Sequence, residues 1–198
     1  MPCAALLRCT SRVVGCVRGQ ISKRLKDKYN CVPVFLPQKM AEQYYNGFSN
    51  DIVWPLFHYF PLPVGKHAQH FDHDLWEAYK AANRLFSETV RRRCWLAPLS
   101  SVFTLTVACV CVCVCVCVCV LYCGPQVIDL HEKGDMVWVQ DYHLMVLPAF
   151  LRARLHKARI GWFLHTPFPS TEVYRMLPVR EEVSLHANAS PSPCRCVW

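Results

Sequence analysis

The sequence predicts an α/β fold with a parallel sheet, and three consecutive patterns indicate it. Two short apolar runs, Met136–Val139 and Ile160–Leu164, are rich in Val, Ile, Trp and Phe and are too short to be helices. Between them, Leu144–Leu155 carries leucines at helical spacing. A strand, a helix and a strand in this order form a right-handed crossover that joins two parallel strands of one sheet.

Polar residues follow both predicted strands directly. The first strand is followed by Gln140, Asp141, Tyr142 and His143, and the second ends at His165. Ligands of open parallel sheets bind just beyond the carboxyl ends of the strands. The pattern therefore predicts a binding site that contains Asp141 and His165.

The elements before these strands fit the same fold class. Cys31–Leu36 is a predicted strand, and Pro33 indicates that it lies at an edge or near a strand start. Pro37 can open a helix that continues through Lys39–Tyr45, because its fixed φ suits the first turn. Residues 61–69 are rich in turn formers and predict a linking loop.

The clearest predicted helix of the chain is Phe71–Val90. Asp72 is a suitable N-cap for it. Apolar residues recur along it at spacings of four, three and four, which predicts one buried stripe. These residues are Leu75, Tyr79, Ala82 and Phe86.

Charge and cysteine content exclude several classes of function. The 198-residue chain has a formal net charge of +8, but no recognition-helix or RNA-binding motif accompanies it, so we expect no nucleic-acid partner. Six of the 14 cysteines stand in one Cys-Val alternation between Cys109 and Cys119, which indicates a reducing compartment rather than a disulfide scaffold. The seven glycines are not clustered, which excludes a dinucleotide-binding fingerprint.

Residues 1–24 form an unassigned basic segment. Met1–Gln20 has no acidic residue, and its apolar positions do not repeat cleanly at helical spacing. The composition is compatible with a transit peptide or with translated sequence that has no selected role, and the irregular spacing favours the second interpretation.

Several motifs resemble those of the trehalose-phosphate synthases, which are retaining glycosyltransferases. The motifs are Trp138-Val-Gln-Asp141-Tyr-His-Leu144, Phe163-Leu-His165-Thr-Pro-Phe-Pro169, Leu177-Pro-Val-Arg180, Tyr44-Tyr-Asn-Gly-Phe-Ser-Asn50 and Val53-Trp-Pro-Leu-Phe-His-Tyr59. The resemblance covers 25–90 and 127–183, and Gln140 departs from the family's usual His. It implies part of the Rossmann-like N-terminal half of a two-domain (GT-B) enzyme that transfers glucose from UDP-glucose to glucose 6-phosphate.

The same resemblance implies roles for four residues. Asp141 and His165 would be catalytic, with Asp141 contacting the sugars of both substrates and His165 lying against the donor glucose and its phosphate. Tyr45 and Trp54 would bind the acceptor sugar phosphate. Each has a purely structural alternative. Asp141 could be a helix N-cap, and His165 a buried histidine that donates to a backbone carbonyl. Tyr45 and Trp54 could be ordinary core residues.

Other candidate residues carry weaker signals. Arg180 could cap a helix or meet a phosphate. His67, His70 and His73 are three residues apart, which is not the four-residue pairing of helical metal ligands, so we expect a loop there and no metal site. UDP-glucose is expected as the donor substrate, without a further cofactor.

Residues 91–126 are expected to be an insertion in the family pattern. One alternative is a transmembrane helix over Leu96–Cys123, and another is a metal-thiolate tract. The third is a retained intron, because an alternating T-G repeat encodes Cys-Val, and the tail 184–198 would then be read-through. We favour the third, since a spanning composition alone is weak evidence where it splits a soluble helix.

The resemblance leaves out parts that the family uses for catalysis. This sequence has no counterpart of the Gly-rich loop that covers the donor in the family, or of the Arg just before that loop. It also has no counterpart of the family's second half, which supplies the cations for the leaving diphosphate. We therefore expect a cytoplasmic chain that is inactive alone and can associate with a full-length homologue. The alternatives are a non-catalytic sugar-phosphate-binding regulatory module and a single-pass membrane protein.

Overall fold

A four-stranded parallel sheet forms the centre of the fold. Its order is β2 (Val102–Leu105), β5 (Met136–Gln140), β6 (Arg159–Phe163) and β7 (Cys196–Val197), and each neighbouring pair is parallel. The computed structural model describes residues 3–29, 31–60, 71–94, 102–105, 109–112, 116–122, 136–156, 159–188 and 196–197. The predicted parallel pairing of the two apolar runs is confirmed, with Met136 opposite Arg159 and Gln140 opposite Phe163.

The connection between β5 and β6 is helical, but its α-helix is shorter than predicted. A 3₁₀ turn, η2 (Tyr142–Leu144), precedes α5 (Leu147–Arg152). An α-helix starting at Leu144 would need the backbone N–H of residue 148 to donate to the Leu144 carbonyl. Pro148 has no N–H, so the α-helix starts later, with Pro148 in its first turn.

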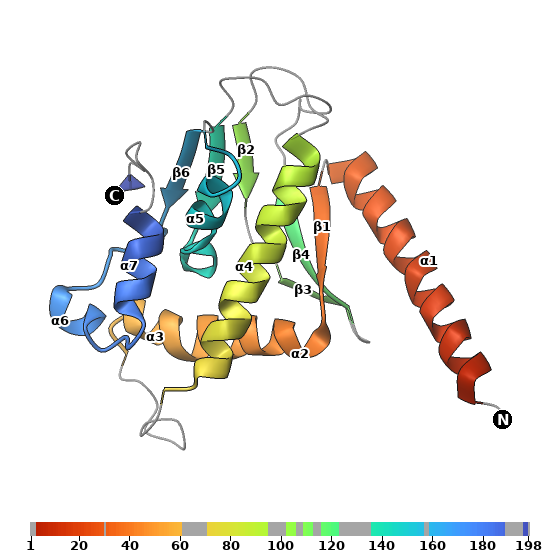
Figure 1. The fold of residues 1–198 in the computed structure, drawn as a ribbon, viewed down its shortest axis with the longest axis horizontal. Coiled ribbons are helices and arrows are strands. Elements are labelled where there is room, and N and C mark those ends of the chain that lie inside the picture. The colour runs from red at the N-terminus through yellow and green to blue at the C-terminus, as the bar shows by residue number, and fades with distance from the viewer. Residues whose placement is uncertain are drawn as a thin grey trace.

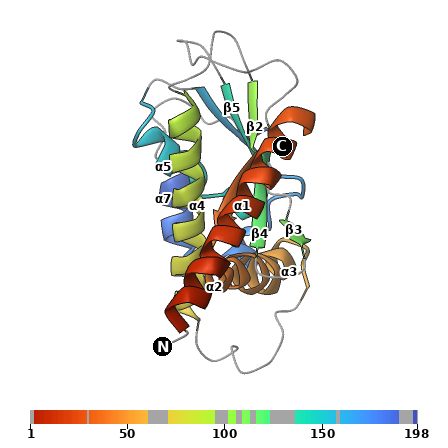
Figure 2. The same ribbon diagram turned by 90° about the vertical axis from the view of Figure 1, so that its right-hand side faces the viewer.

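Helix α4 (His73–Cys94) confirms the predicted long helix. The backbone N–H of Asp74 donates to Asp72 Oδ1 over 2.9 Å, which is the expected capping bond. Tyr79, Ala82 and Phe86 are fully buried. Helices α4, α5 and α7 (Arg180–Asn188) lie on one side of the strands (Figure 2).

A continuous helical segment crosses the molecule at the carboxyl ends of the central strands (Figure 1). It begins after β1 (Cys31–Leu36) and consists of α2 (Gln38–Ala41), the π-helix η1 (Glu42–Val53) and α3 (Trp54–Phe57). It packs closely on α4, because a Cβ at Gly47 would lie 2.6 Å from a methyl carbon of Leu75. A short helix, α6 (Thr171–Tyr174), precedes α7.

The basic N-terminal segment is helical, although its apolar residues do not repeat cleanly at helical spacing. Helix α1 spans Cys3–Tyr29 and lies across the outside of β1 (Figures 1 and 2). The segment contains no proline after residue 2 and several good helix formers, and local propensity does not require a buried stripe. The guanidinium of Arg18 lies 5.1 Å from the ring centre of Phe35, which attaches α1 to β1.

The described parts of the insertion 91–126 extend α4 to Cys94 and then form strands. In addition to β2, they form β3 (Cys109–Val112) and β4 (Val116–Tyr122), and the antiparallel order is β1-β4-β3. The alternative of a membrane helix over 96–123 is therefore wrong for these residues. No helix in the described part of the chain is long and apolar enough to cross a membrane.

Candidate active site

The carboxyl ends of β5 and β6 bring the predicted residues together. The Nε2 atom of His165 lies 2.9 Å from Oε1 of Gln140, the last residue of β5. The backbone N–H of Asp141 donates to the carbonyl oxygen of Phe163 over 2.7 Å. His165 is exposed and pairs with a side chain, so the alternative of a buried histidine bonded to a backbone carbonyl is wrong.

Asp141 has an unusual backbone and an unpaired carboxylate oxygen. Its φ of 68° and ψ of 171° lie in a region that L residues rarely adopt. Its side chain makes no capping hydrogen bond, so the N-cap alternative is wrong. Its Oδ1 is buried without a hydrogen-bond partner in the described structure. A buried carboxylate oxygen is costly to leave unpaired, which indicates a site prepared for a hydrogen-bond donor from outside.

His143 lies beside Asp141 between two aromatic rings. Tyr142 stacks on it at 4.1 Å between ring centroids and Tyr45 at 5.4 Å. His143 Nδ1 is 3.8 Å from Asp141 Oδ2, and its Nε2 is buried without a hydrogen-bond partner in the described residues. Burial lowers the pKa of His143 to about 4, against the opposing effect of the Asp141 carboxylate, so the imidazole is neutral near pH 7.

Tyr142 contributes a second neutral polar group to this site. Burial, and then the nearby Asp141 charge, raises the pKa of Tyr142 to about 12. The cluster thus presents one carboxylate together with uncharged imidazole and phenol groups. Imidazole and phenol groups accept hydrogen bonds from hydroxyls and donate hydrogen bonds to hydroxyls, and they do so without adding a permanent positive charge to the site.

The two predicted acceptor-binding residues occupy different environments. Tyr45 belongs to η1, is half-buried and is brought into the site by its contact with His143. Trp54 is 39% exposed and stacks on His58 and Phe60, so the core-packing alternative is wrong for it. Its helix α3 adjoins the site, because the ring of Phe57 lies 6.3 Å from that of Tyr142.

The sequence placed Tyr142 and His143 directly after the first predicted strand, but the predicted site contained only Asp141 and His165 of these strand-end residues. The available signal was their position just beyond a predicted strand, where ligands of open parallel sheets bind. Arg180 begins α7, where its Nη1 donates to the Arg175 carbonyl over 3.4 Å; phosphate binding by Arg180 stays a prediction.

The predicted absence of a metal site concerns residues that are only partly described. His67 and His70 lie outside the described residues, and His73 is exposed at the start of α4. Within the described ranges, no three His, Cys, Asp or Glu side chains gather as metal ligands do.

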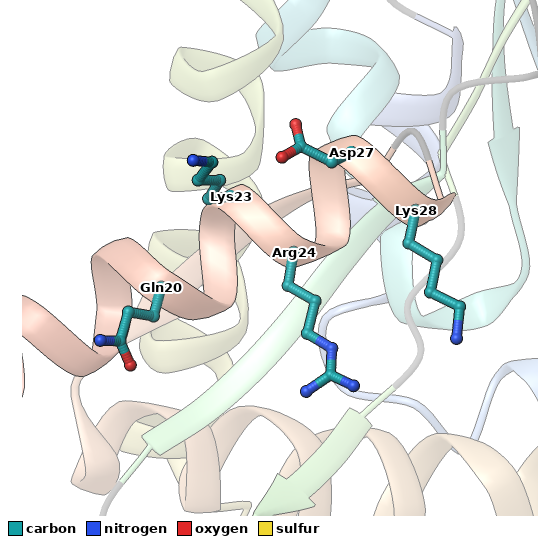
Figure 3. Close-up of a pocket in the computed structure, with 5 residues that line it drawn as sticks. All are labelled: Gln20, Lys23, Arg24, Asp27 and Lys28. Atoms are coloured by element: carbon teal, nitrogen blue, oxygen red, sulfur yellow. The ribbon is translucent and has the colours of Figure 1, made fainter.

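A surface hollow lies on α1, away from this site. It is lined by Gln20, Lys23, Arg24, Asp27 and Lys28. Figure 3 shows that these side chains come from one helix and spread in different directions. All five lining residues belong to α1, so the hollow is not enclosed by a second element. It therefore offers no converging set of polar groups comparable to that around Asp141.

Comparisons with known proteins agree with the fold. The family model of Glycosyltransferase family 20 matches residues 9–94 and 122–186, and it leaves 95–121 unmatched. An Aspergillus fumigatus UDP-forming alpha,alpha-trehalose-phosphate synthase is 41% identical over 170 residues, which is 83% of this chain and 27% of the relative. The Saccharomyces cerevisiae 56 kDa synthase subunit is 36% identical over 171 residues, covering 84% and 26%. The chain therefore spans about a quarter of the length of these curated relatives.

Solved structures show the same similarity. A Burkholderia vietnamiensis UDP-forming synthase superimposes with a TM-score of 0.52 at 25% identity, over 78% of this chain and 28% of that one. An Escherichia coli structure bound with UDP-2-fluoro glucose gives 0.52 at 26% identity, over 77% and 24%. The partial Rossmann-like architecture predicted from the motifs is thus confirmed. From the site, the family match and the level of identity together, the chain belongs to glycosyltransferase family 20.

Proposed function

We propose that this chain is part of the substrate-binding region of an enzyme of trehalose biosynthesis. The reaction joins C1 of the glucose of UDP-glucose to the anomeric hydroxyl of glucose 6-phosphate, with retained configuration. The bond to the diphosphate breaks with its electron pair going to UDP, and the hydroxyl proton is released. The observation that carries the proposal is the unpaired Oδ1 of Asp141 beside neutral His143, in a chain of this family.

The site residues have distinct roles in this proposal. Asp141 accepts hydrogen bonds from sugar hydroxyls through the unpaired oxygen. His165 contacts the donor glucose, and Gln140 fixes the orientation of its ring. Tyr45 and the exposed Trp54 bind glucose 6-phosphate, because each offers an apolar face and one hydrogen-bond donor. UDP-glucose is the donor substrate, and the proposed transfer uses no further cofactor.

We further propose that the 198-residue chain alone binds sugar phosphate but does not transfer glucose. The described groups around Asp141 are a carboxylate, an amide, imidazoles and phenols, whereas the departing diphosphate of UDP needs positive charge. Electrostatic stabilisation of developing charge is usually the largest catalytic contribution. The cations would come from outside these residues, for example from a full-length homologue bound to this chain.

Calorimetric titration with glucose 6-phosphate tests the binding half of this proposal. The variants are Tyr45→Phe, which keeps the ring, and Trp54→Phe, which replaces the indole with a smaller aromatic ring; each removes one donor. We expect each to weaken binding by about 3- to 10-fold, the value of one hydrogen bond. Tyr174→Phe is the control, because its hydroxyl donates to the Arg180 carbonyl in α7 instead. Equal affinity in all four proteins, or no binding to any, would refute the binding role.

A transfer assay tests the catalytic half. Labelled UDP-glucose and glucose 6-phosphate are incubated with the chain, and trehalose 6-phosphate is separated and counted. We expect no product from the chain alone, and product formation there would refute its inactivity. If the chain binds glucose 6-phosphate and changes the rate of a full-length homologue without adding turnover, the regulatory-module alternative is favoured.

A further inference from the structure

The turn that carries Asp141 is held by side chains that come from distant parts of the sequence. The indole N–H of Trp162 donates to the Asp141 carbonyl over 3.0 Å. The Tyr44 hydroxyl, at 3.1 Å, and the Asn83 amide, at 3.3 Å, both donate to the His143 carbonyl. Several backbone polar groups of Asp141–Met145 are therefore satisfied by η1, α4 and β6 rather than by a regular helix.

Tyr79 of α4 makes the shortest of these contacts and makes two of them. Its hydroxyl donates to the Tyr142 carbonyl over 2.6 Å and accepts from the backbone N–H of Met145 over 3.0 Å. One phenol can do both, because it carries one proton and two lone pairs. The side chain is fully buried, and burial raises the pKa of Tyr79, so the hydroxyl stays protonated. The Tyr79 hydroxyl thus bridges the Tyr142 carbonyl and the Met145 N–H on either side of the turn.

The conformation that this hydroxyl holds is one that Asp141 would not adopt by preference. At φ 68° and ψ 171°, every residue except glycine is strained. Strain of this kind persists only where the surrounding contacts outweigh it. The hydrogen bonds to the Tyr142 and His143 carbonyls and to the Met145 N–H lie directly after Asp141 and can outweigh this strain.

We propose that Tyr79 is a positioning residue whose hydroxyl holds the Asp141–Met145 turn in the strained conformation that presents the Asp141 carboxylate beyond β5. Its consequence for sugar binding rests on the proposed function, whereas its effect on the turn does not. The ring of Tyr79 has a separate role in the core, because it packs on Phe48 at 4.6 Å and on Trp76 at 5.6 Å between centroids. Tyr79→Phe keeps this packing and removes the hydroxyl alone.

Hydrogen exchange of the Leu144 amide reports on the turn without involving Tyr79 directly. Leu144 N–H donates to the Asp141 carbonyl over 3.2 Å. If the hydroxyl holds the turn, Tyr79→Phe should speed exchange at Leu144 by about tenfold, since the bond becomes free to open locally. Tyr174→Phe, the matched removal of a hydroxyl that is only partly buried, should leave Leu144 unchanged. Unchanged exchange at Leu144 in Tyr79→Phe would overturn the proposal.

A double-mutant cycle with Asp141→Gly measures the coupling. Glycine relieves the backbone strain, so Asp141→Gly should shift the urea midpoint upward relative to Asp141→Ala in the otherwise unchanged chain. In the Tyr79→Phe background the turn has already relaxed, and the difference between Gly and Ala should shrink or vanish. An equal difference in both backgrounds would show that Tyr79 and the Asp141 backbone are independent.

Two further measurements separate the possible failures. In the unmodified chain, the buried Tyr79 phenol that donates over 2.6 Å should give a slowly exchanging hydroxyl proton near the Tyr142 carbonyl. Absence of this proton signal would overturn the proposal. This test holds even if Tyr79→Phe does not fold. Glucose 6-phosphate affinity should fall in Tyr79→Phe and not in Tyr174→Phe. If the unmodified chain binds no glucose 6-phosphate while the exchange and cycle results hold, the proposed function fails and the positioning role stands.

Discussion

The Nε2 atom of His165 lies 2.9 Å from Oε1 of Gln140, so the last residue of β5 orients the histidine that follows β6. The two strands are neighbours in the sheet, and this contact joins their carboxyl ends outside the backbone ladder. An amide oxygen accepts a hydrogen bond and cannot donate one, so this arrangement requires a proton on Nε2. In the neutral ring Nδ1 then remains as a hydrogen-bond acceptor.

This contact predicts the tautomer of His165. Long-range ¹H–¹⁵N spectra should show His165 protonated on Nε2 in the unmodified chain. Gln140→Leu removes the acceptor, so both tautomers should then be populated. His58 is an internal control, because its Nδ1 lies 2.7 Å from the Trp54 carbonyl and must be the protonated nitrogen in both proteins. Protonation of His165 on Nδ1 in the unmodified chain would contradict the prediction.

Burial of His143 predicts a loss of stability in acid. Its pKa is lowered from 6.5 to about 4 in the folded chain, so between these values the unfolded chain binds the proton and the folded chain does not. The free energy of unfolding therefore has its full value above about pH 6.5. It falls as the pH drops toward 4, by roughly 3 kcal/mol in total. Urea unfolding measured across this range gives the slope.

Replacement of the imidazole tests whether His143 causes that slope. His143→Gln removes the titrating group, so the free energy of unfolding should depend less steeply on pH between about 6.5 and 4. His156→Gln, a change at an exposed histidine, is the matched control. An identical slope in His143→Gln and the unmodified chain would contradict the assignment.

Gly161 of β6 is predicted to tolerate no side chain. A Cβ there would lie 2.7 Å from Cε3 of Trp138, which stands opposite it on β5. Gly161→Ala should lower the free energy of unfolding by about 1–3 kcal/mol, the usual cost of overpacking. Gly19→Ala is the control, because nothing lies within 4 Å of its Cβ and alanine is the better helix former, by about 0.5–1 kcal/mol.

The cause of the Gly161 effect can be separated from a general loss of strand stability. Trp138→Leu removes the indole atoms that the new methyl group would contact, so it should recover part of the stability of Gly161→Ala. An additive effect of the two substitutions would show that the overlap with Trp138 is not the reason.

Removal of residues 95–121 is predicted to restore direct pairing of β1 with β5. Both strands run in the direction of the α2–η1–α3 segment, with α4 between them in sequence (Figure 1). The insertion now supplies their partners, since β4 pairs with β1 and β2 with β5. Nuclear Overhauser contacts between the two strands in the shortened chain would confirm the prediction, and two unpaired strands would contradict it.

The same deletion should reduce aggregation. An alternating Cys-Val tract has high β-propensity and no charge, which favours cross-strand association. Light scattering of concentrated samples compares the full and shortened chains. A third chain, with the six cysteines between Cys109 and Cys119 changed to Ser, separates disulfide cross-linking from strand association. Equal scattering of the full and shortened chains would contradict the prediction.

Local patterns in the sequence predicted much of the fold and part of the site. The apolar runs at 136–139 and 160–164 predicted parallel strands, because strand length and flanking polar residues are local properties. The position of Asp141 and His165 just beyond these strands followed from the same pattern. The family motifs added Tyr45 and Trp54. The irregular spacing of apolar residues in Met1–Gln20 gave no signal for the helix that forms there.

The sequence by itself determined the parallel β5–α5–β6 unit, the family, and which polar residues stand at the strand ends. Only the tertiary structure decided how those residues are held. The strained Asp141 backbone, the rings on both sides of His143, and the hydroxyl of Tyr79 at the turn all depend on contacts between η1, α4 and η2. Tyr79 and Tyr142 are 63 positions apart, and no local pattern specifies which buried phenol meets which carbonyl. That choice is made by packing of the helices on the sheet.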